Sequence, residues 1–254
     1  AKNATFHHHA PAMQRINTMN DFSSELHSFL EEKNYVSPWI VSHEEHNTLL
    51  AGVGSIATVK KKNYLFLQGE SNKNVYIVRT GRLRIFYSDQ SGAEKSIYIL
   101  ERGGMIGENS AFDSTPAHIS AYAITDTTLF RINIRDFLRI ISLHPMVSLE
   151  VIHSLNYKVR LLCSQMEYST KSSVVRVTAA LLALCARYGE VQPDGSIRIS
   201  IRFTHEELSN LINLNRVTVS KIYHDLLQKK IISNPKGYIT VHDIESLKGW
   251  MDQT

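Results

Sequence analysis

Cysteine is scarce in this chain: Cys163 and Cys185 are the only two among 254 residues. Two thiols can form at most one disulfide, and both lie in helix-like apolar patterns, so no disulfide framework is expected. Two cysteines are also too few for a four-cysteine iron–sulfur cluster held by this chain alone. Because no histidine, cysteine or carboxylate spacing matches a metal-ligand motif, we predict no metal and no cofactor.

Long apolar runs are missing as well. No stretch approaches the roughly 18–20 apolar residues that a membrane-spanning helix needs, and the first residues lack the apolar core and cleavage site of a secretory signal. We therefore expect a soluble, cytoplasmic protein without a membrane partner. The first 14 residues are polar, and we interpret His7, His8 and His9 as part of a flexible tail or a leftover of cloning rather than a metal site.

Charge is nearly balanced overall but uneven along the chain. The 28 basic and 24 acidic residues give a net charge of +4. Between Arg198 and Lys236 there are seven basic and three acidic residues, so this stretch holds the whole excess of four. A basic face on one short stretch is typical of a protein that binds a phosphate backbone, although many solvated surfaces have the same composition.

Short β-prone runs alternate with turn residues from about Asn63 to Ile132, which is typical of a small antiparallel barrel or sandwich. Leu83, Ile85 and Tyr87 recur at every second position, as expected for a strand with one buried face. The pattern predicts a β-roll over residues 41–143, after an N-terminal tail and lead-in segment of residues 1–40. The runs are Tyr64–Leu67, Val75–Arg79, Leu83–Tyr87, Ser96–Leu100, Tyr122–Ile124 and Thr128–Ile132.

After Asn133 the apolar period changes from two to about 3.5 residues, which predicts a long helix from near Pro145 to Thr170. We assign residues 144–171 to this dimerisation helix, because its apolar stripe favours a parallel seam between two copies of the chain. The alternative is that the stripe packs on its own roll, but Val151 and Leu161 are available for that contact. The predicted dimer interface consists of Ile152, Leu155, Val159, Leu162 and Met166.

Residues 172–254 have the pattern of a winged helix-turn-helix. The polar stretch Ser169–Ser173 marks the boundary and supplies an N-cap for the helix Val174–Tyr188. Two β-prone runs, Ile197–Ile201 and Tyr238–Val241, then flank two helical segments. Thr204 and Glu207 form a capping box at the start of the first segment, and Asn215 caps the second, which extends to about Lys229.

The second of these helices carries the residues that we expect to contact DNA. At 100° per residue, Val219, Ile222 and Leu226 point to the core, and the opposite face is polar and basic. In helix-turn-helix docking the N-terminal residues of the second helix meet base edges in the major groove. Val217 on this face suits contact with a thymine methyl; the alternative is a stray surface valine. The predicted DNA-binding residues are Thr204, Asn215, Arg216, Val217, Thr218, Ser220, Lys221 and His224.

Three stretches, in this order, resemble the Crp/Fnr superfamily of bacterial transcription regulators. NVYIVRTGRLRIFYSDQSGAEKSIYILERGGMIGENSAF is similar to its cyclic-nucleotide-binding-like jelly roll, FTHEELSNLINLNRVTVSKIYHDLLQKKII is similar to its DNA-reading motif, and the seam helix lies between them. The resemblance implies an α+β protein with an N-terminal antiparallel β-roll, a long dimerisation helix and a C-terminal winged helix-turn-helix. It also implies a regulator, not an enzyme, whose partners are double-stranded DNA, a second copy, a small-molecule effector and RNA polymerase.

Departures from the family pattern bear on the effector. Members that bind cyclic AMP carry an arginine after the Gly-Glu pair, but this chain keeps Gly107 and Glu108 and has Ala117 or His118 where the arginine falls, which leaves a phosphate charge without a partner. The hydroxyl residues that meet adenine are replaced by Leu161 and Leu162. The resemblance is therefore nearest to the CprK-type regulators of halorespiration, and it implies an aromatic organic effector in the roll. The candidate effector-binding residues are Gly107, Glu108, Asn109, His118, Tyr87, Tyr98, Tyr122, Tyr157 and Leu161.

The recognition helix agrees with this subgroup. Its Val-Thr-Val-Ser-Lys run is close to the Val-x-x-Ser-Arg of the CprK type, and valine in place of an acceptor should favour A·T over G·C at that step. Lysine at position 221 loses the bidentate fork that arginine offers guanine. Other interpretations stay open: a regulator that responds to cyclic nucleotide or haem, a sensor module that does not bind DNA, and tyrosines that are ordinary core. Acid/base chemistry at Glu108 with His118 lacks the carboxylate pair or nucleophile that an enzyme would need.

Overall fold

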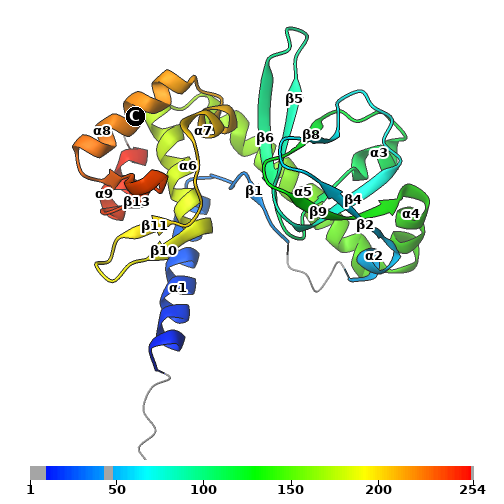
Figure 1. Ribbon diagram of the computed structural model, residues 1–254, viewed down its shortest axis with the longest axis horizontal. Helices are drawn as coiled ribbons and strands as arrows, with labels where there is room; N and C mark the ends of the chain where they lie inside the picture. The colour runs from blue at the N-terminus through cyan, green and yellow to red at the C-terminus, as the bar shows by residue number, and fades with distance from the viewer. Residues whose placement is uncertain (1–9, 43–47, 253–254) are drawn as a thin grey trace, which may run out of the picture. The chain divides into compact units, whose positions relative to one another are not determined.

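The computed structural model describes residues 10–42 and 48–252, so His7, His8 and His9 lie outside the described residues. The chain forms two compact units (Figure 1). One is built mainly from Val36–Glu167, and the other combines the N-terminal helix with most of the chain after Glu167. Within the described ranges, no helix combines the length and the apolar character needed to span a membrane.

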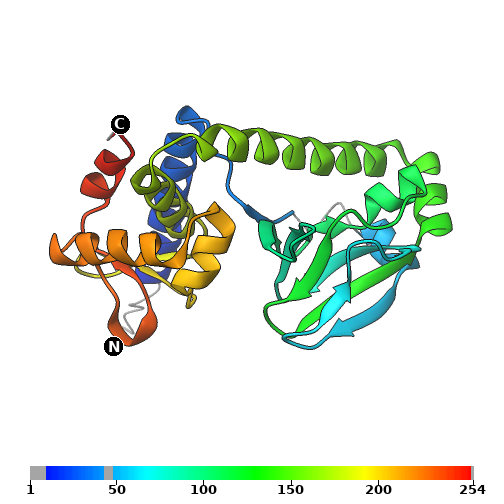
Figure 2. The same ribbon diagram turned by 90° about the horizontal axis from the view of Figure 1, so that it is seen from above.

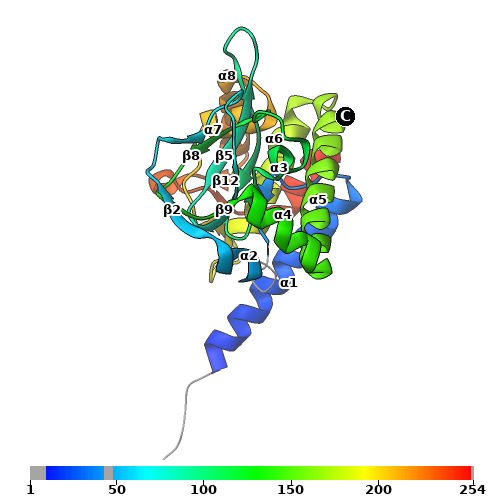
Figure 3. The same ribbon diagram turned by 90° about the vertical axis from the view of Figure 1, so that its right-hand side faces the viewer.

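Two sheets build the first unit (Figures 1 and 3). One has the order β1 (Trp39–Ile40), β6 (Glu94–Leu100), β5 (Leu83–Ser88), β8 (Ser120–Ala123) and β3 (Tyr64–Phe66). The other has the order β2 (Ser55–Val59), β9 (Thr127–Asn133), β4 (Asn74–Thr80) and β7 (Met105–Ile106). Strand β1 is parallel to β6, and the other pairs are antiparallel. Every predicted β-prone run overlaps a strand, which confirms the β-roll.

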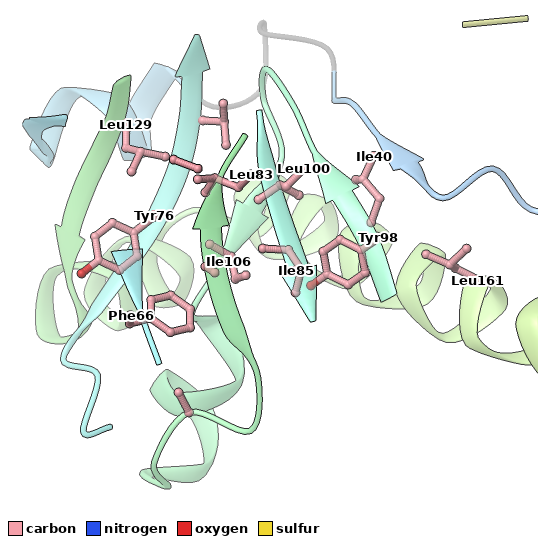
Figure 4. Packing of buried hydrophobic residues seen from close by; sticks show 14 residues of the cluster. Ile40, Phe66, Tyr76, Leu83, Ile85, Tyr98, Leu100, Ile106, Leu129 and Leu161 are labelled. Atoms are coloured by element: carbon pink, nitrogen blue, oxygen red, sulfur yellow. The ribbon is translucent and has the colours of Figure 1, made fainter. Parts of the chain in front are cut away.

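The main core of the roll lies between these sheets (Figure 4). Leu83 and Ile85 of β5 and Leu129 of β9 are fully buried and belong to one cluster. Leu161 of the long helix belongs to the same cluster and is also fully buried. The packing of Leu161 on the roll is as the sequence predicts.

Tyr87 departs from the alternation that the sequence predicts for β5. The Tyr87 side chain is 39% exposed, although Leu83 and Ile85 of the same strand are fully buried. Strand β5 pairs with β8 only as far as Phe86, which lies opposite Ser120, so at Tyr87 the strand has β6 alone as a neighbour. Tyr87 therefore points to solvent rather than into the roll.

The described residues of this unit also form the helices α2 (Thr48–Val53), α3 (Glu108–Asp113), α4 (Ile134–Leu143) and most of α5 (Pro145–Ser169). The side chain of Asn133 caps α4 by accepting a hydrogen bond from the Arg135 N–H. A second cluster joins Ile77 of β4 to Phe137 of α4 and Val151 of α5. Helix α5 is unbroken over 25 residues (Figure 2), in agreement with the predicted helix.

In the second unit the central helix is α6 (Ser173–Tyr188). The Ser172 side chain caps it by accepting from the Val175 N–H, as the polar stretch predicts. Every residue from Val177 to Ala186 is buried, which is typical of a helix covered on all sides. One covering element is α1 (Ala10–Glu32), whose Leu26 and Leu30 are buried. This helix was not predicted, since the segment was expected to be only a tail and lead-in.

Around α6 the chain forms a winged helix-turn-helix, which confirms the predicted fold class. A four-stranded sheet has the order β10 (Gly189–Val191), β11 (Ile197–Ile199), β13 (Thr240–Val241) and β12 (Ile232–Ser233). The helix pair is α7 (His205–Ile212) and α8 (Arg216–Gln228). The turn η2 (Pro235–Gly237), α9 (Ile244–Gly249) and η3 (Trp250–Asp252) complete the unit.

Candidate DNA-reading surface and effector site

Both helices of the motif begin at side-chain caps, as predicted. Thr204 Oγ1 accepts a hydrogen bond from the Glu207 N–H at 3.1 Å, and the Glu207 carboxylate accepts from the Thr204 N–H at 2.8 Å. Asn215 Oδ1 accepts from the Thr218 N–H at 2.7 Å. In the intervening turn, Asn213 has a φ of 54°, a left-handed conformation that asparagine tolerates better than most residues. These caps fix where α8 starts and therefore which residues occupy its first turn.

Helix α8 separates an apolar face from a polar one. Val219, Ile222 and Leu226 are buried as predicted, and Tyr223, which was not predicted, is buried with them. On the opposite face Val217 is 64% exposed. The Val217 side chain therefore does not contribute to the hydrophobic core of its own unit.

A shallow depression of about 510 Å³ runs along the exposed face of α8. Five of the predicted DNA-binding residues line it, together with Asp225, which was not predicted. The other three are the cap residues Thr204 and Asn215 and the half-buried Thr218. Two cations and one carboxylate leave the depression net positive. Its lining residues are Arg216, Val217, Ser220, Lys221, His224 and Asp225.

His205 is a neighbour of this face that the sequence analysis missed. Its Nδ1 lies 2.9 Å from Ser220 Oγ, and its ring is tilted against Tyr223 with centroids 4.3 Å apart. Burial, and then the positive charge of Arg216, lower the pKa of His205. No spacing or composition signal marks this histidine in the sequence, since the contact depends on how α7 and α8 cross.

Further cations lie in the wing. The guanidinium groups of Arg198 and Arg202 lie 4.6 and 5.1 Å from the centre of the Tyr238 ring. Lys236, in the adjacent turn, is exposed. Stacking on an aromatic ring limits the freedom of an arginine without neutralising its charge. These residues account for three of the seven cations in the basic stretch.

The candidate effector site is a cavity of about 20 Å³ in the roll, where α3 begins. Gly107 has a φ of 96°, and a Cβ there would lie 2.5 Å from the Asn74 carbonyl oxygen, so the position requires glycine. Five of the nine candidate effector residues line the cavity. Phe66, Asn72, Ile106, Ser110, Ala117 and Ile119 complete the lining with Tyr98, Gly107, Glu108, Asn109 and His118.

The other four candidates lie elsewhere in the roll unit. Tyr87 is exposed, for the reason given above, and Tyr122 packs edge-on against Tyr64 at 5.2 Å. The Tyr157 hydroxyl donates a hydrogen bond to the Ser37 carbonyl oxygen at 2.9 Å. Leu161 belongs to the roll core.

Glu108, one of the lining residues, belongs to a buried ion pair. The Lys158 ammonium group, from α5, donates to the Glu108 carboxylate and, at 2.9 Å, to the Met105 carbonyl oxygen. The side chains of Glu108 and Lys158 are only 2% and 10% exposed. We expected Glu108 to bond a backbone or ligand hydroxyl; instead it pairs with Lys158. The sequence did carry a signal, because Lys158 lies seven residues after Val151 and three before Leu161, on the roll-facing side of α5.

The opposite side of α5 is apolar and exposed. Of the five residues predicted at the dimer interface, four are 46–73% exposed, and Leu155 packs in part against the roll. The four exposed residues are Ile152, Val159, Leu162 and Met166. Among the described residues no group of three or more histidine, cysteine or carboxylate side chains is placed to hold a metal ion.

Two protein-family signatures match the chain: a cyclic nucleotide-binding domain at residues 56–144 and a Crp-like helix-turn-helix domain at residues 175–250. The cyclic AMP receptor protein of Thermus thermophilus is 29% identical over 185 residues, which cover 72% of this chain and 82% of that protein. The global nitrogen regulator of Synechocystis sp. is 27% identical over 193 residues, which cover 74% of this chain and 84% of that protein.

Solved structures show the same fold. A CooA mutant from Carboxydothermus hydrogenoformans matches with a TM-score of 0.70 at 22% identity, over 83% of this chain and 92% of that one. CprK complexed with OCPA matches with a TM-score of 0.68 at 19% identity, over 84% of this chain and 96% of that one. Both signatures lie in the order of that fold, over the roll and the helix-turn-helix described above. The chain belongs to the Crp/Fnr family of effector-regulated, DNA-binding transcription regulators.

Proposed function

We propose that the chain acts as a homodimer that reads a near-palindromic, A·T-leaning operator through α8, under the control of a small organic molecule other than cyclic AMP. Effector sensing is assigned to residues 41–143, dimerisation to 144–171 and DNA reading to 172–254. The observation that carries the proposal is the exposed face of α8, where Arg216 and Lys221 flank an open Val217. Cations suit phosphates and the valine suits a thymine methyl.

The exposed stripe on α5 supports the dimer. Apolar side chains that are 46–73% exposed along one helix face form the kind of surface that a partner helix covers. A two-fold symmetric pair would present two copies of α8 to successive major grooves, about 34–36 Å apart. The operator should therefore contain inverted half-sites about one helical turn apart.

The buried ion pair bears on the effector. Small-molecule sites usually enclose about 300–1,000 Å³, so the cavity of about 20 Å³ has to open before an organic molecule fits. Because Lys158 already neutralises Glu108, an entering acid that takes Glu108's place on Lys158 would break one pair and form another. Neighbouring Tyr98 offers a ring for stacking. CprK, complexed with OCPA, is a precedent within the fold.

Cyclic AMP fits this site poorly. Ala117 is buried in the lining and carries no charge. Lys158 is a cation that the sequence argument did not count, but a cyclic phosphate would have to take it from Glu108 and leave that carboxylate unpaired. We propose in addition that RNA polymerase is a partner and that the regulator works in the cytoplasm, where bacterial DNA is.

DNA binding can be tested by fluorescence anisotropy with a duplex enriched from a random library. Arg216→Gln and Lys221→Gln should each weaken binding and lower the slope of log affinity against log salt by about one, because each removes one positive charge from the face that meets the polyanionic duplex. Lys61→Gln makes the same charge change on the roll and should leave both quantities unchanged. Affinity that ignores salt, or equal losses in all three variants, would contradict DNA contact through α8.

A further inference from the structure

The contact between His205 and Ser220 points to a residue that tunes DNA readout without touching DNA. Ser220 lines the open depression on α8, so its hydroxyl can meet a base edge. His205 is the first residue of α7 and follows Thr204, whose side chain caps this helix, so the backbone of His205 is fixed. The His205 ring is held by two residues of α8, Ser220 through Nδ1 at 2.9 Å and the buried Tyr223 through its ring.

What Ser220 offers a base depends on the direction of this hydrogen bond. A serine hydroxyl has one proton to donate and two lone pairs that accept. If the proton goes to Nδ1, only lone pairs remain for DNA. If Nδ1 carries a proton and donates it, the serine proton stays available. A base edge with an amine and one with a carbonyl oxygen would therefore be told apart by the state of a residue behind the serine.

The positive charge near the His205 ring favours donation from the Ser220 hydroxyl to Nδ1. Arg216 precedes Ser220 by four residues on α8, so both lie on the same side of that helix. The Nδ1 atom faces Ser220 and hence the side that carries Arg216. A nearby positive charge stabilises a lone pair at Nδ1 relative to an N–H, and Arg216 together with burial lowers the pKa of His205, which keeps the ring neutral.

We propose that His205 is a specificity-determining positioning residue: it accepts the Ser220 proton at Nδ1 and so presents Ser220 to the major groove as an acceptor. Ser220 then selects a base that presents an amine in the major groove, adenine or cytosine, over guanine or thymine on the contacted strand. The inference rests on the proposed DNA reading by α8. It extends that reading to a base step next to the one that Val217 meets.

The test compares operators that differ at one step. Selection with the wild type and with Ser220→Ala identifies the step at which their preferences differ, and anisotropy then measures four duplexes carrying each base there. The wild type should favour adenine or cytosine by about two- to tenfold, the range that one hydrogen bond supplies. His205→Phe keeps a ring against Tyr223 but removes Nδ1, and should abolish the preference at this step only. The double variant His205→Phe/Ser220→Ala should have the same base preference at this step as either single variant.

His205→Asn is the conservative variant, since its amide can place an acceptor near the position of Nδ1, and it should restore most of the preference. Thermal melting shows whether His205→Phe is folded. If it is not, the preference of the His205→Asn protein at this step tests the proposal instead. A His205→Phe protein that binds all four duplexes more weakly but keeps the wild-type preference would overturn the proposal. So would a wild-type preference for guanine or thymine, or a Ser220→Ala protein with an unchanged selected site. A wild type that binds the enriched duplex no better than a scrambled one would instead overturn the proposed function itself.

Discussion

Removing the Lys158 ammonium group should destabilise the roll strongly, because it leaves a buried carboxylate without its partner. In Lys158→Met the apolar stem is largely retained, so little packing is lost. Glu108, only 2% exposed, then lacks its counter-charge, and the Met105 carbonyl oxygen loses one donor. Removing one partner of a buried ion pair lowers the free energy of unfolding by about 3–5 kcal/mol, whereas replacing both partners by uncharged groups often changes it little. The double variant Glu108→Gln/Lys158→Met should therefore be more stable than Lys158→Met alone.

The two tryptophans make this measurable unit by unit. Trp39 lies in the roll and Trp250 in the other unit, so urea unfolding followed by fluorescence in a Trp250→Phe background reports the roll. The ion-pair argument would be refuted if Lys158→Met and Glu108→Gln each lowered the free energy of unfolding by less than about 1 kcal/mol. It would also be refuted if the loss in the double variant equalled the sum of the losses in the two single variants.

Four further expectations concern DNA reading, self-association, thiol reactivity and ligand binding. Val217→Glu should move half-site preference toward G·C at one step, because a carboxylate accepts from the cytosine amine; an unchanged selected site would contradict the thymine contact. Ile152→Lys with Val159→Lys, both 57% exposed, should give folded monomers in sedimentation that lose operator binding, and a persistent dimer would remove the α5 seam. Thiol titration should modify the exposed Cys163 and spare Cys185, because burial raises the pKa of Cys185 to about 12; fast modification of Cys185 would contradict this. Calorimetry with cyclic AMP should show no saturable heat, and micromolar binding of cyclic AMP would contradict the choice of effector.

Local chemistry explains what the sequence predicted correctly. The caps at Thr204 and Asn215 depend on residues three positions away, and the buried face of α8 depends on a period of 3.6 residues. Such relations are complete within one helix and are readable without the fold. The same is true of Leu161, whose place on the roll-facing side of α5 follows from the stripe.

Long-range geometry explains what was missed. Tyr87 is exposed because the pairing of β5 with β8 ends at Phe86, and His205 meets Ser220 only because two helices cross. Lys158 was passed over because a charged residue on a buried face is explained only by its partner Glu108, which lies 50 residues earlier. Helix α1 begins in a stretch without apolar periodicity, and its Leu26 and Leu30 gain their meaning from packing in the unit that contains α6.

Selection of operators from a random duplex library by the full chain tests the central claim most directly. The account predicts an enriched inverted repeat whose half-sites lie about 10–10.5 base pairs apart, centre to centre, with a thymine at the step that Val217 contacts. A library that gives no inverted repeat after several rounds, while the protein remains folded, would contradict the claim that paired α8 helices read DNA.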